Sequence, residues 1–304
     1  MITYDHFYYL HNAIVGVLNQ ECDFEFELII SDDCSPIDPS SILENLKDHK
    51  KFSSIKYFRH QVNKGPSENY LWSLKQCQGD YVANCEGDDF WVDLNKLQKQ
   101  VQLLDTNSNI IATCSNSITI DETGKSLNKD FLINNDMILS TEDIIGYTYY
   151  NFIPTASVVF RNIKDSIFIS EFKKLKGFDW SLLFLLSLKG NIFFDSNPMV
   201  AYRITGKGLN SQLNEIEKIK NVIDLYALFG FFYPKFEHLC RIKINECFEH
   251  IKYLHNKNHI EENQYLKSKI LDFEFDIQNL EQIISFKEYI KIGLKKIKLF
   301  FKQL

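Results

Sequence analysis

The segment at residues 81–91 constrains the fold most, because a short apolar run ends there in three carboxylates. The run at residues 81–83 is typical of a buried strand, and Glu86, Asp88 and Asp89 follow it at once. Carboxylates this close repel one another and raise each other's pKa, so they indicate a bound cation. Mg²⁺ and Mn²⁺ take oxygen ligands, commonly carboxylates together with substrate phosphates. The sequence therefore predicts a metal-diphosphate site at the edge of a sheet.

Apolar strand-like runs alternate with helical spacing along the first two thirds of the chain. Strands are predicted at residues 27–31, 55–59, 81–83, 110–120, 157–160, 192–194 and 199–202, and helices at 7–20, 42–50, 95–105 and 178–188. A further helix follows a loop at residues 63–67 and runs to about residue 78. This alternation predicts an α/β fold with a mostly parallel sheet flanked by helices. Ligands of such sheets bind beyond the carboxyl ends of the strands, where Asp32 and Asp33 form a second acidic cluster.

Composition narrows the class of protein. The 304 residues are 45% hydrophobic, enough for one large domain or a domain with an appendage. A net charge of -6 argues against a nucleic-acid partner. The seven cysteines include no C-x-x-C pair, which favours neither disulfides nor zinc and fits a reducing cytoplasm. We expect neither a signal peptide nor a membrane-spanning helix.

The last third of the chain has a different character. A boundary is predicted near residue 211, so that residues 212–304 form a helical C-terminal region. Its final segment, residues 286–304, has lysines on one side and apolar residues on the other, namely Phe286, Ile290, Leu294, Ile297, Phe301 and Leu304. This basic amphipathic helix either lies on an anionic membrane surface or docks on the preceding domain. The first alternative predicts a peripheral protein at the inner face of the cell membrane.

Several short motifs occur in a specific order over residues 2–210. They are Thr3-Tyr4-Asp5-His6, Ile29-Ile30-Ser31-Asp32-Asp33-Cys34-Ser35, Asn63-Lys64-Gly65-Pro66, Glu86-Gly87-Asp88-Asp89-Phe90-Trp91, Phe178-Asp179-Trp180 and Ala201-Tyr202-Arg203. In this order and spacing the chain resembles the family 2 glycosyltransferases, which have the Rossmann-like GT-A fold. The resemblance implies a GT-A domain over residues 1–211.

The resemblance also implies a reaction. Such enzymes take a nucleotide-sugar donor, here expected to be a UDP-sugar, and use Mn²⁺ or Mg²⁺ in an inverting transfer to a hydroxyl. The metal stabilises the charge that gathers on the diphosphate leaving group, and a base deprotonates the acceptor. We expect a hexosyl- or N-acetylhexosaminyl-transferase. Its acceptor would be a glycan or lipid-linked glycan of bacterial surface polysaccharide, lipooligosaccharide or glycoprotein synthesis.

Residue roles follow from the matching motifs. Asp33 resembles the carboxylate that binds the nucleotide base, with Thr3 and Tyr4 in the same pocket, whereas Asp32 is expected to stabilise the turn. Asp88 and Asp89 resemble the aspartates that hold the metal, and Asp88 also contacts the nucleotide.

The catalytic base is a separate residue. Asp179 resembles that base, although a carboxylate in the first turn of a helix is also a common N-cap. Further candidates for diphosphate or acceptor contacts are Glu86, Trp91, Trp180 and Arg203; core packing or an ion pair is the structural alternative for the last three.

Two departures from the family pattern leave other functions open. Only Met1 and Ile2 stand where relatives have a longer first strand, which indicates a truncated strand. Thr205 also occupies a position where relatives often have a histidine. One alternative is therefore a catalytically impaired binding or scaffold subunit. Another is a sugar nucleotidyltransferase, but the chain has no glycine-rich phosphate loop near its N-terminus.

Overall fold

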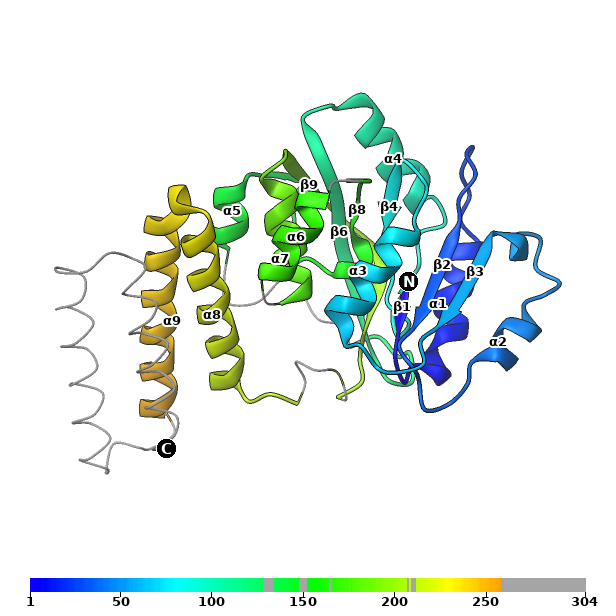
Figure 1. Ribbon diagram of the computed structural model, residues 1–304, viewed down its shortest axis with the longest axis horizontal. Coiled ribbons are helices and arrows are strands. Elements are labelled where there is room, and N and C mark those ends of the chain that lie inside the picture. Colours follow the sequence, from blue (N-terminus) through cyan, green and yellow to red (C-terminus); the bar gives the residue numbers. More distant parts are fainter. Residues whose placement is uncertain are drawn as a thin grey trace. The chain divides into compact units, whose positions relative to one another are not determined.

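The computed structural model describes residues 1–127, 134–147, 152–163, 166–175, 177–206, 208 and 212–257. The chain divides into two compact units, residues 1–144 with 151–211 and residues 145–150 with 212–304 (Figure 1). The basic segment at residues 286–304 lies outside the described residues. Among the described helices, none has both the length and the apolar character needed to cross a membrane.

The first sheet consists of three short parallel strands in the order β1-β2-β3. The strands are β1 (Ile2–Thr3), β2 (Leu28–Asp32) and β3 (Ile55–Arg59), and the helices that follow them are α1 (Phe7–Leu18), α2 (Ser40–Asn45) and α3 (Pro66–Gln76). A 3₁₀ helix, η1 (Phe52–Ser54), precedes β3. Helix α3 packs on β1 and β2, while α1 shares a hydrophobic core with Leu28 and Ile30. All five residues of β2 are buried, including the polar Ser31 and Asp32 at its end.

The second sheet has the order β4-β8-β6-β9-β5, and β7 pairs with β9. Its strands are β4 (Tyr81–Ala83), β5 (Phe90–Trp91), β6 (Ile110–Asp121), β7 (Met137–Leu139), β8 (Val159–Arg161) and β9 (Asn191–Ile204). Strands β6 and β9 are parallel, but the other pairs are antiparallel. The architecture is mixed α/β as predicted, yet this sheet is less parallel than expected. The short strands β5 and β7 pair with the long β9 in the antiparallel direction.

Strand β9 runs continuously through the two segments that the sequence predicts as separate strands. The sequence between them, which ends in Pro198, is typical of a turn. The strand accommodates it through register shifts in the pairing of Asn116 with Pro198. Irregularities of this kind tolerate a proline because the ladder hydrogen bond is already interrupted.

Helices cover the second sheet within the first unit. Helix α4 (Lys96–Thr106) packs on β6 and β8, and α7 (Phe178–Ser187) packs on β6 and β9. The remaining elements are α5 (Thr141–Gly146), η2 (Thr155–Ser157) and α6 (Ser166–Lys174). All residues of α7 from Trp180 onward are buried, which matches its almost uninterrupted apolar sequence.

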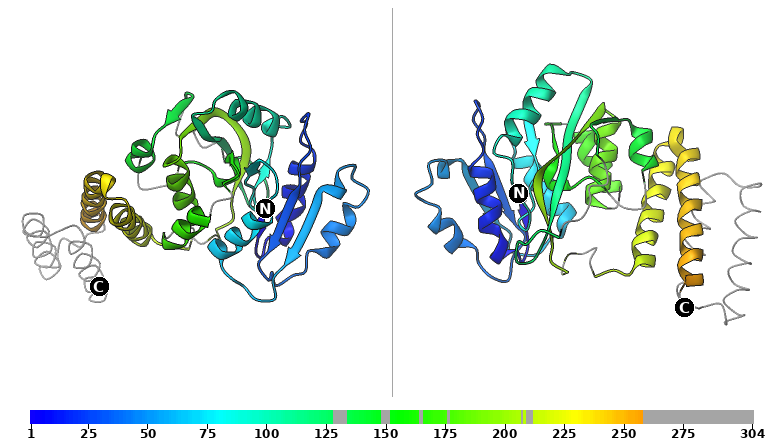
Figure 2. Two further views of the ribbon diagram at one scale, coloured as in Figure 1. Left: turned by 45° about the horizontal axis from the view of Figure 1, so that its top comes forward. Right: turned by 180° about the vertical axis from the view of Figure 1, so that it is seen from behind.

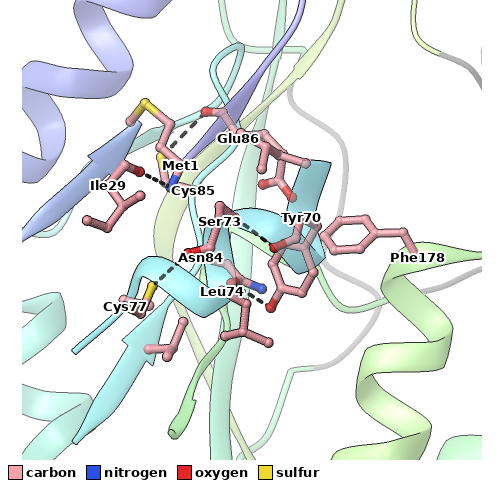
Figure 3. Close-up of a pocket in the computed structure, with 13 residues that line it drawn as sticks. Met1, Ile29, Tyr70, Ser73, Leu74, Cys77, Asn84, Cys85, Glu86 and Phe178 are labelled. Atoms are coloured by element: carbon pink, nitrogen blue, oxygen red, sulfur yellow. Dashed lines mark hydrogen bonds between the residues drawn. The ribbon is translucent and has the colours of Figure 1, made fainter. Parts of the chain in front are cut away.

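Strand β1 joins the two sheets through very few contacts. Ile2 forms one isolated parallel bridge with Glu86, and its carbonyl accepts the Gly87 N–H at 3.0 Å. The Met1 ammonium is buried and donates to the Ile29 carbonyl at 2.8 Å (Figure 3), and burial lowers its pKa. A cavity of about 460 Å³ next to Met1 is lined by residues of both β2 and β4. The sheet is thus interrupted at β1.

The second unit contains two long helices that pack against each other, α8 (Glu215–Phe232) and α9 (Glu237–Lys257), with η3 (Pro234–Phe236) between them (Figure 2). Helix α8 begins at a reciprocal cap. The Asn214 side chain accepts the Glu217 N–H at 2.9 Å, and the Glu217 carboxylate accepts the Asn214 N–H at 3.0 Å.

Candidate active site

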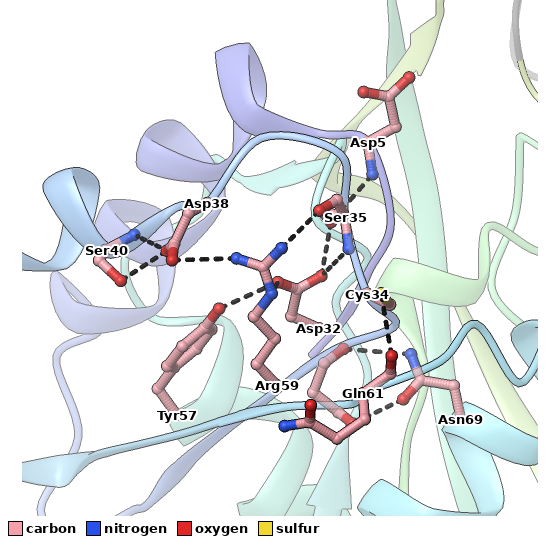
Figure 4. A network of polar contacts seen from close by, with 11 residues as sticks. Asp5, Asp32, Cys34, Ser35, Asp38, Ser40, Tyr57, Arg59, Gln61 and Asn69 are labelled. Atoms are coloured by element: carbon pink, nitrogen blue, oxygen red, sulfur yellow. Dashed lines mark hydrogen bonds and ion pairs between the residues drawn. The ribbon is translucent and has the colours of Figure 1, made fainter.

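The two adjacent aspartates at the end of β2 have different environments. Asp32 is fully buried and accepts hydrogen bonds from the Ser35 N–H and the Tyr57 hydroxyl, both at 2.9 Å (Figure 4). The Arg59 guanidinium lies 3.6 Å from the same carboxylate. Asp32 therefore stabilises the turn after β2 and has no face left for a ligand.

Asp33 holds the loop that precedes α3. Its two carboxylate oxygens accept the N–H groups of Lys64 and Gly65, each at 2.8 Å. Gly65, with a φ of 82°, is the N-cap of α3. The Asp33 N–H donates to the Thr3 carbonyl at 2.9 Å, so the end of β1 lies beside it. Thr3 is buried, whereas Tyr4 is 46% exposed. The three residues predicted to bind the nucleotide are thus neighbours.

Two non-glycine residues with left-handed backbones flank this sheet edge. Asp5, with a φ of 57°, follows β1, and Cys34, with a φ of 64°, follows β2; the described residues include no other such case. The Asp5 N–H is fixed by the Ser35 hydroxyl at 3.1 Å. Backbone strain of this kind persists only where surrounding structure enforces it, and it concentrates at functional sites.

The acidic cluster after β4 contains carboxylates with unequal access to solvent. Asp89 is 4% exposed and accepts the Arg203 N–H at 2.8 Å, whereas the Asp88 side chain is 22% exposed. Burial, and then the neighbouring Asp88 charge, raise the pKa of Asp89 and raise the pKa of Glu86 to about 8. The Oε2 atom of Glu86 is buried without a hydrogen-bond partner. The cluster therefore carries repulsion that a cation would relieve.

The start of α7 brings a fourth carboxylate near this cluster. Asp179 accepts the Trp180 N–H at 2.9 Å, as a residue of the first helical turn can. Its negative charge contributes to the raised pKa of Glu86. Phe178, the residue before it, lines the same small pocket as Glu86 (Figure 3). The structure therefore brings the predicted base and the predicted metal site together from separate elements.

Tyr202 is a site residue that the sequence analysis did not single out. Its side chain is 45% exposed, and its pKa is raised to about 12 by partial burial and by the charges of Asp89, Asp88, Glu86 and Asp179. A phenol in this position can donate a hydrogen bond without competing as an acid. The sequence feature that could have indicated Tyr202 was the Tyr-Arg pair at the end of β9, of which only the arginine was predicted to have a function.

Arg203 supports the acidic cluster through hydrogen bonds. Its guanidinium donates to the carbonyls of Asp88, Asp121 and Glu122 at 2.9, 3.1 and 3.2 Å. It also lies 4.6 Å from the centre of the Tyr9 ring. These contacts favour the structural alternative, because the guanidinium already has carbonyl partners where a diphosphate contact was predicted.

The two tryptophans near the cluster are parts of the core. Trp91 is 5% exposed, and its indole N–H donates to the Ala156 carbonyl at 3.0 Å. Trp180 is 6% exposed. Core packing, the alternative to stacking on a sugar, therefore describes both rings in this structure.

A glycine allows β1 to approach the cluster closely. A Cβ atom at Gly87 would lie 2.5 Å from the Thr3 Oγ1 and 3.0 Å from the His6 Nδ1. Only glycine fits between these side chains without displacement. His6 is the second residue that the sequence analysis missed; it follows Thr3-Tyr4-Asp5 directly, which was the available signal.

Comparisons with known proteins agree with this geometry. The family model described as "Glycosyl transferase family 2" matches residues 1–168. The protein Rv1520 of Mycobacterium tuberculosis is 29% identical over 209 residues, which cover 68% of this chain and 58% of that protein. The GalNAc(5)-diNAcBac-PP-undecaprenol beta-1,3-glucosyltransferase of Campylobacter jejuni is 38% identical over 81 residues, 26% of this chain and 25% of its own length. The chain thus spans less than two thirds of these relatives.

Solved structures show the same fold at low identity. TarS of S. aureus (residues 1-349), in complex with UDP-GlcNAc, has a TM-score of 0.55 and 15% identity, covering 75% of this chain and 65% of that one. The mannosyltransferase PcManGT of Pyrobaculum calidifontis, in complex with GDP-Man and Mn²⁺, has a TM-score of 0.53 and 9% identity, covering 97% and 84%. These likenesses show the GT-A fold.

Proposed function

Because the chain belongs to the family 2 glycosyltransferases, we propose that it moves a sugar from a nucleotide-sugar donor to an acceptor hydroxyl with inversion. The observation that carries this proposal is the meeting of four carboxylates, Glu86, Asp88, Asp89 and Asp179, from two separate segments. Family membership favours sugar transfer over the nucleotidyltransferase alternative.

The acidic cluster suits Mn²⁺ or Mg²⁺. No group of three metal-ligating side chains is assembled within the described residues, so substrate oxygens and water would complete the coordination. Of the two predicted metal ligands, Asp88 is the accessible one, while Asp89 is committed to the Arg203 backbone. Glu86 has a buried oxygen without a partner at the same place. When bound, the cation would neutralise charge on the departing diphosphate.

The nucleotide would occupy the adjoining edge of the first sheet. Asp33 and Thr3 meet there by a backbone hydrogen bond of 2.9 Å, and Tyr4 exposes its ring beside them. A planar base can stack on such a ring while the carboxylate accepts its N–H. Uridine is the proposed base because the family resemblance implies a UDP-sugar; of the two solved neighbours, TarS holds UDP-GlcNAc and PcManGT holds GDP-Man.

Asp179 is the proposed general base. Inversion requires a carboxylate that deprotonates the acceptor on the side of the sugar away from the leaving diphosphate. Asp179 is the candidate for this role that the resemblance gives, and it comes from α7, whereas Asp88 and Glu86 follow β4. Glu86 and Tyr202, on which the charges of Asp88 and Asp179 both act, would contact the sugar or diphosphate.

The proposed acceptor is a glycan or lipid-linked glycan of a bacterial surface polymer, lipooligosaccharide or glycoprotein. The name of the Campylobacter relative describes a glycan on a PP-undecaprenol carrier, which supports this class. The basic sequence at residues 286–304 supports a peripheral position at the inner face of the cell membrane. The transferred group would be a hexose or an N-acetylhexosamine.

Turnover of a panel of nucleotide sugars tests the proposal. We expect the purified chain to release UDP from one UDP-sugar in the presence of Mn²⁺, to stop in EDTA, and to resume when Mn²⁺ is restored. Asp88→Asn should reduce turnover strongly without unfolding the protein. If the wild type binds UDP with Mn²⁺ but turns over no donor with any glycan acceptor, the scaffold-subunit alternative is correct.

A further inference from the structure

We propose that His6 is a metal ligand of this enzyme and that its Nε2 atom and the Asp88 carboxylate hold the divalent cation between them. The inference rests on the proposed function and names a residue for it. His6 Nε2 lies 3.6 Å from Asp88 Oδ2. That distance exceeds a normal N–H···O hydrogen bond of about 2.7–3.2 Å. Two ligands about 2.1 Å from a shared ion stand about 3.0–3.5 Å apart, so a cation fits between these atoms after a small adjustment.

The acidic cluster that contains Asp88 also has one unpartnered carboxylate oxygen. Glu86 Oε2 is buried and lacks a hydrogen-bond partner, and the negative charge of Asp88 acts on the same carboxylate and helps to raise its pKa. Buried polar atoms are normally satisfied, and exceptions call for a specific explanation such as an ion. Gly87 keeps the space beside the imidazole open, since a Cβ there would approach His6 Nδ1 to 3.0 Å. Glu86 is therefore a candidate for a further oxygen ligand beside the His6–Asp88 pair.

The position of His6 in the chain fixes its orientation. It is the N-cap residue of α1 and follows Asp5, whose left-handed backbone turns the chain from β1 into the helix. Its side chain is 26% exposed, so solvent and substrate can reach the pair. The residue therefore faces the cluster because of the β1–α1 turn, and no long flexible side chain is involved.

A nitrogen ligand changes the metal preference. Mg²⁺ binds oxygen ligands almost exclusively, whereas imidazole suits first-row transition ions. A site with His6 and Asp88 should therefore discriminate between Mn²⁺ and Mg²⁺ more than a site with carboxylates alone. Removing the imidazole should reduce Mn²⁺ affinity more than Mg²⁺ affinity.

Electron paramagnetic resonance of Mn²⁺ bound to the full chain with UDP tests this proposal. We expect a nitrogen coupling in the pulsed spectrum of the wild type that disappears in His6→Ala, together with a loss of Mn²⁺ affinity of about tenfold or more. Mg²⁺ affinity should fall less. His11→Ala is the matched control, because His11 is an exposed residue of α1 and should change neither property.

The outcomes separate this inference from the proposed function. A wild-type spectrum with no nitrogen coupling, or normal Mn²⁺ binding by His6→Ala while Asp88→Asn loses it, rejects His6 as a ligand and leaves the glycosyltransferase mechanism intact. Absence of any Mn²⁺ binding by the wild type with UDP would reject the metal-dependent mechanism itself. If His6→Ala is unstable by thermal unfolding, His6→Gln keeps the side-chain volume and gives the same readout.

Discussion

Replacement of Asp179 by asparagine should lower sugar transfer by about 10²- to 10⁴-fold and leave donor binding unchanged. The amide cannot accept the proton of the acceptor hydroxyl. It keeps the shape of the carboxylate, and its oxygen can still accept the Trp180 N–H at the start of α7. The expected loss is therefore in turnover and not in folding. Initial rates of UDP release, together with calorimetric titration of the donor, measure the two effects separately.

A matched acid elsewhere provides the control for this experiment. Asp48 is exposed and lies beyond α2, so Asp48→Asn should behave like the wild type. If Asp179→Asn retains more than about a tenth of the wild-type rate with normal donor affinity, the base is another group. Tyr202 would then be the next residue to replace, given its place among the carboxylates.

Replacement of Asp32 by alanine should destabilise the protein by about 3 kcal/mol. The carboxylate is fully buried, and its removal leaves the Tyr57 hydroxyl and the Ser35 N–H without their acceptor. The Arg59 guanidinium would keep its contact with Asp38 at 3.0 Å and its hydrogen bond to the Ser35 carbonyl at 2.7 Å, and it is 30% exposed, which moderates the loss. Urea unfolding followed by circular dichroism measures the free energy of unfolding.

Asp33→Ala is the informative comparison. It removes the acceptor of the Lys64 and Gly65 N–H groups, which a more accessible loop can give to water. We therefore expect a smaller loss of stability than for Asp32→Ala and a large loss of UDP affinity. Equal stability losses in the two variants would contradict the assignment of Asp32 as structural and Asp33 as nucleotide-binding.

The course of the chain and the location of its acidic clusters were predictable from local pattern. Strand β3 begins and ends at the predicted residues, and helices α1, α4 and α7 lie within a few residues of expectation. The family resemblance, and not local pattern, separated the roles of Asp32 and Asp33, because the partners that distinguish them, Tyr57 and Lys64, lie 25 and 31 residues further along the chain.

The same limit applies within the second cluster. Asp89 is distinguished from Asp88 by a hydrogen bond to Arg203, which is 114 positions away. His6 and Tyr202 join the site only through contacts between separate elements. Residue type and spacing therefore located the site, whereas the different roles of its residues depend on tertiary contacts.

The interruption of the sheet at β1 has a consequence for cooperativity. The proposed nucleotide contacts and His6 follow strands of the first sheet, whereas Glu86 and Asp88 follow β4 of the second sheet, and β1 forms a single bridge with Glu86. Weakly connected segments can open as separate units with different free energies. We expect amide hydrogens of β3 to exchange faster than those of β6 in the free protein, and UDP-sugar with Mn²⁺ to slow both. Mass-spectrometric exchange would show whether the donor is the component that makes the two sheets behave as one.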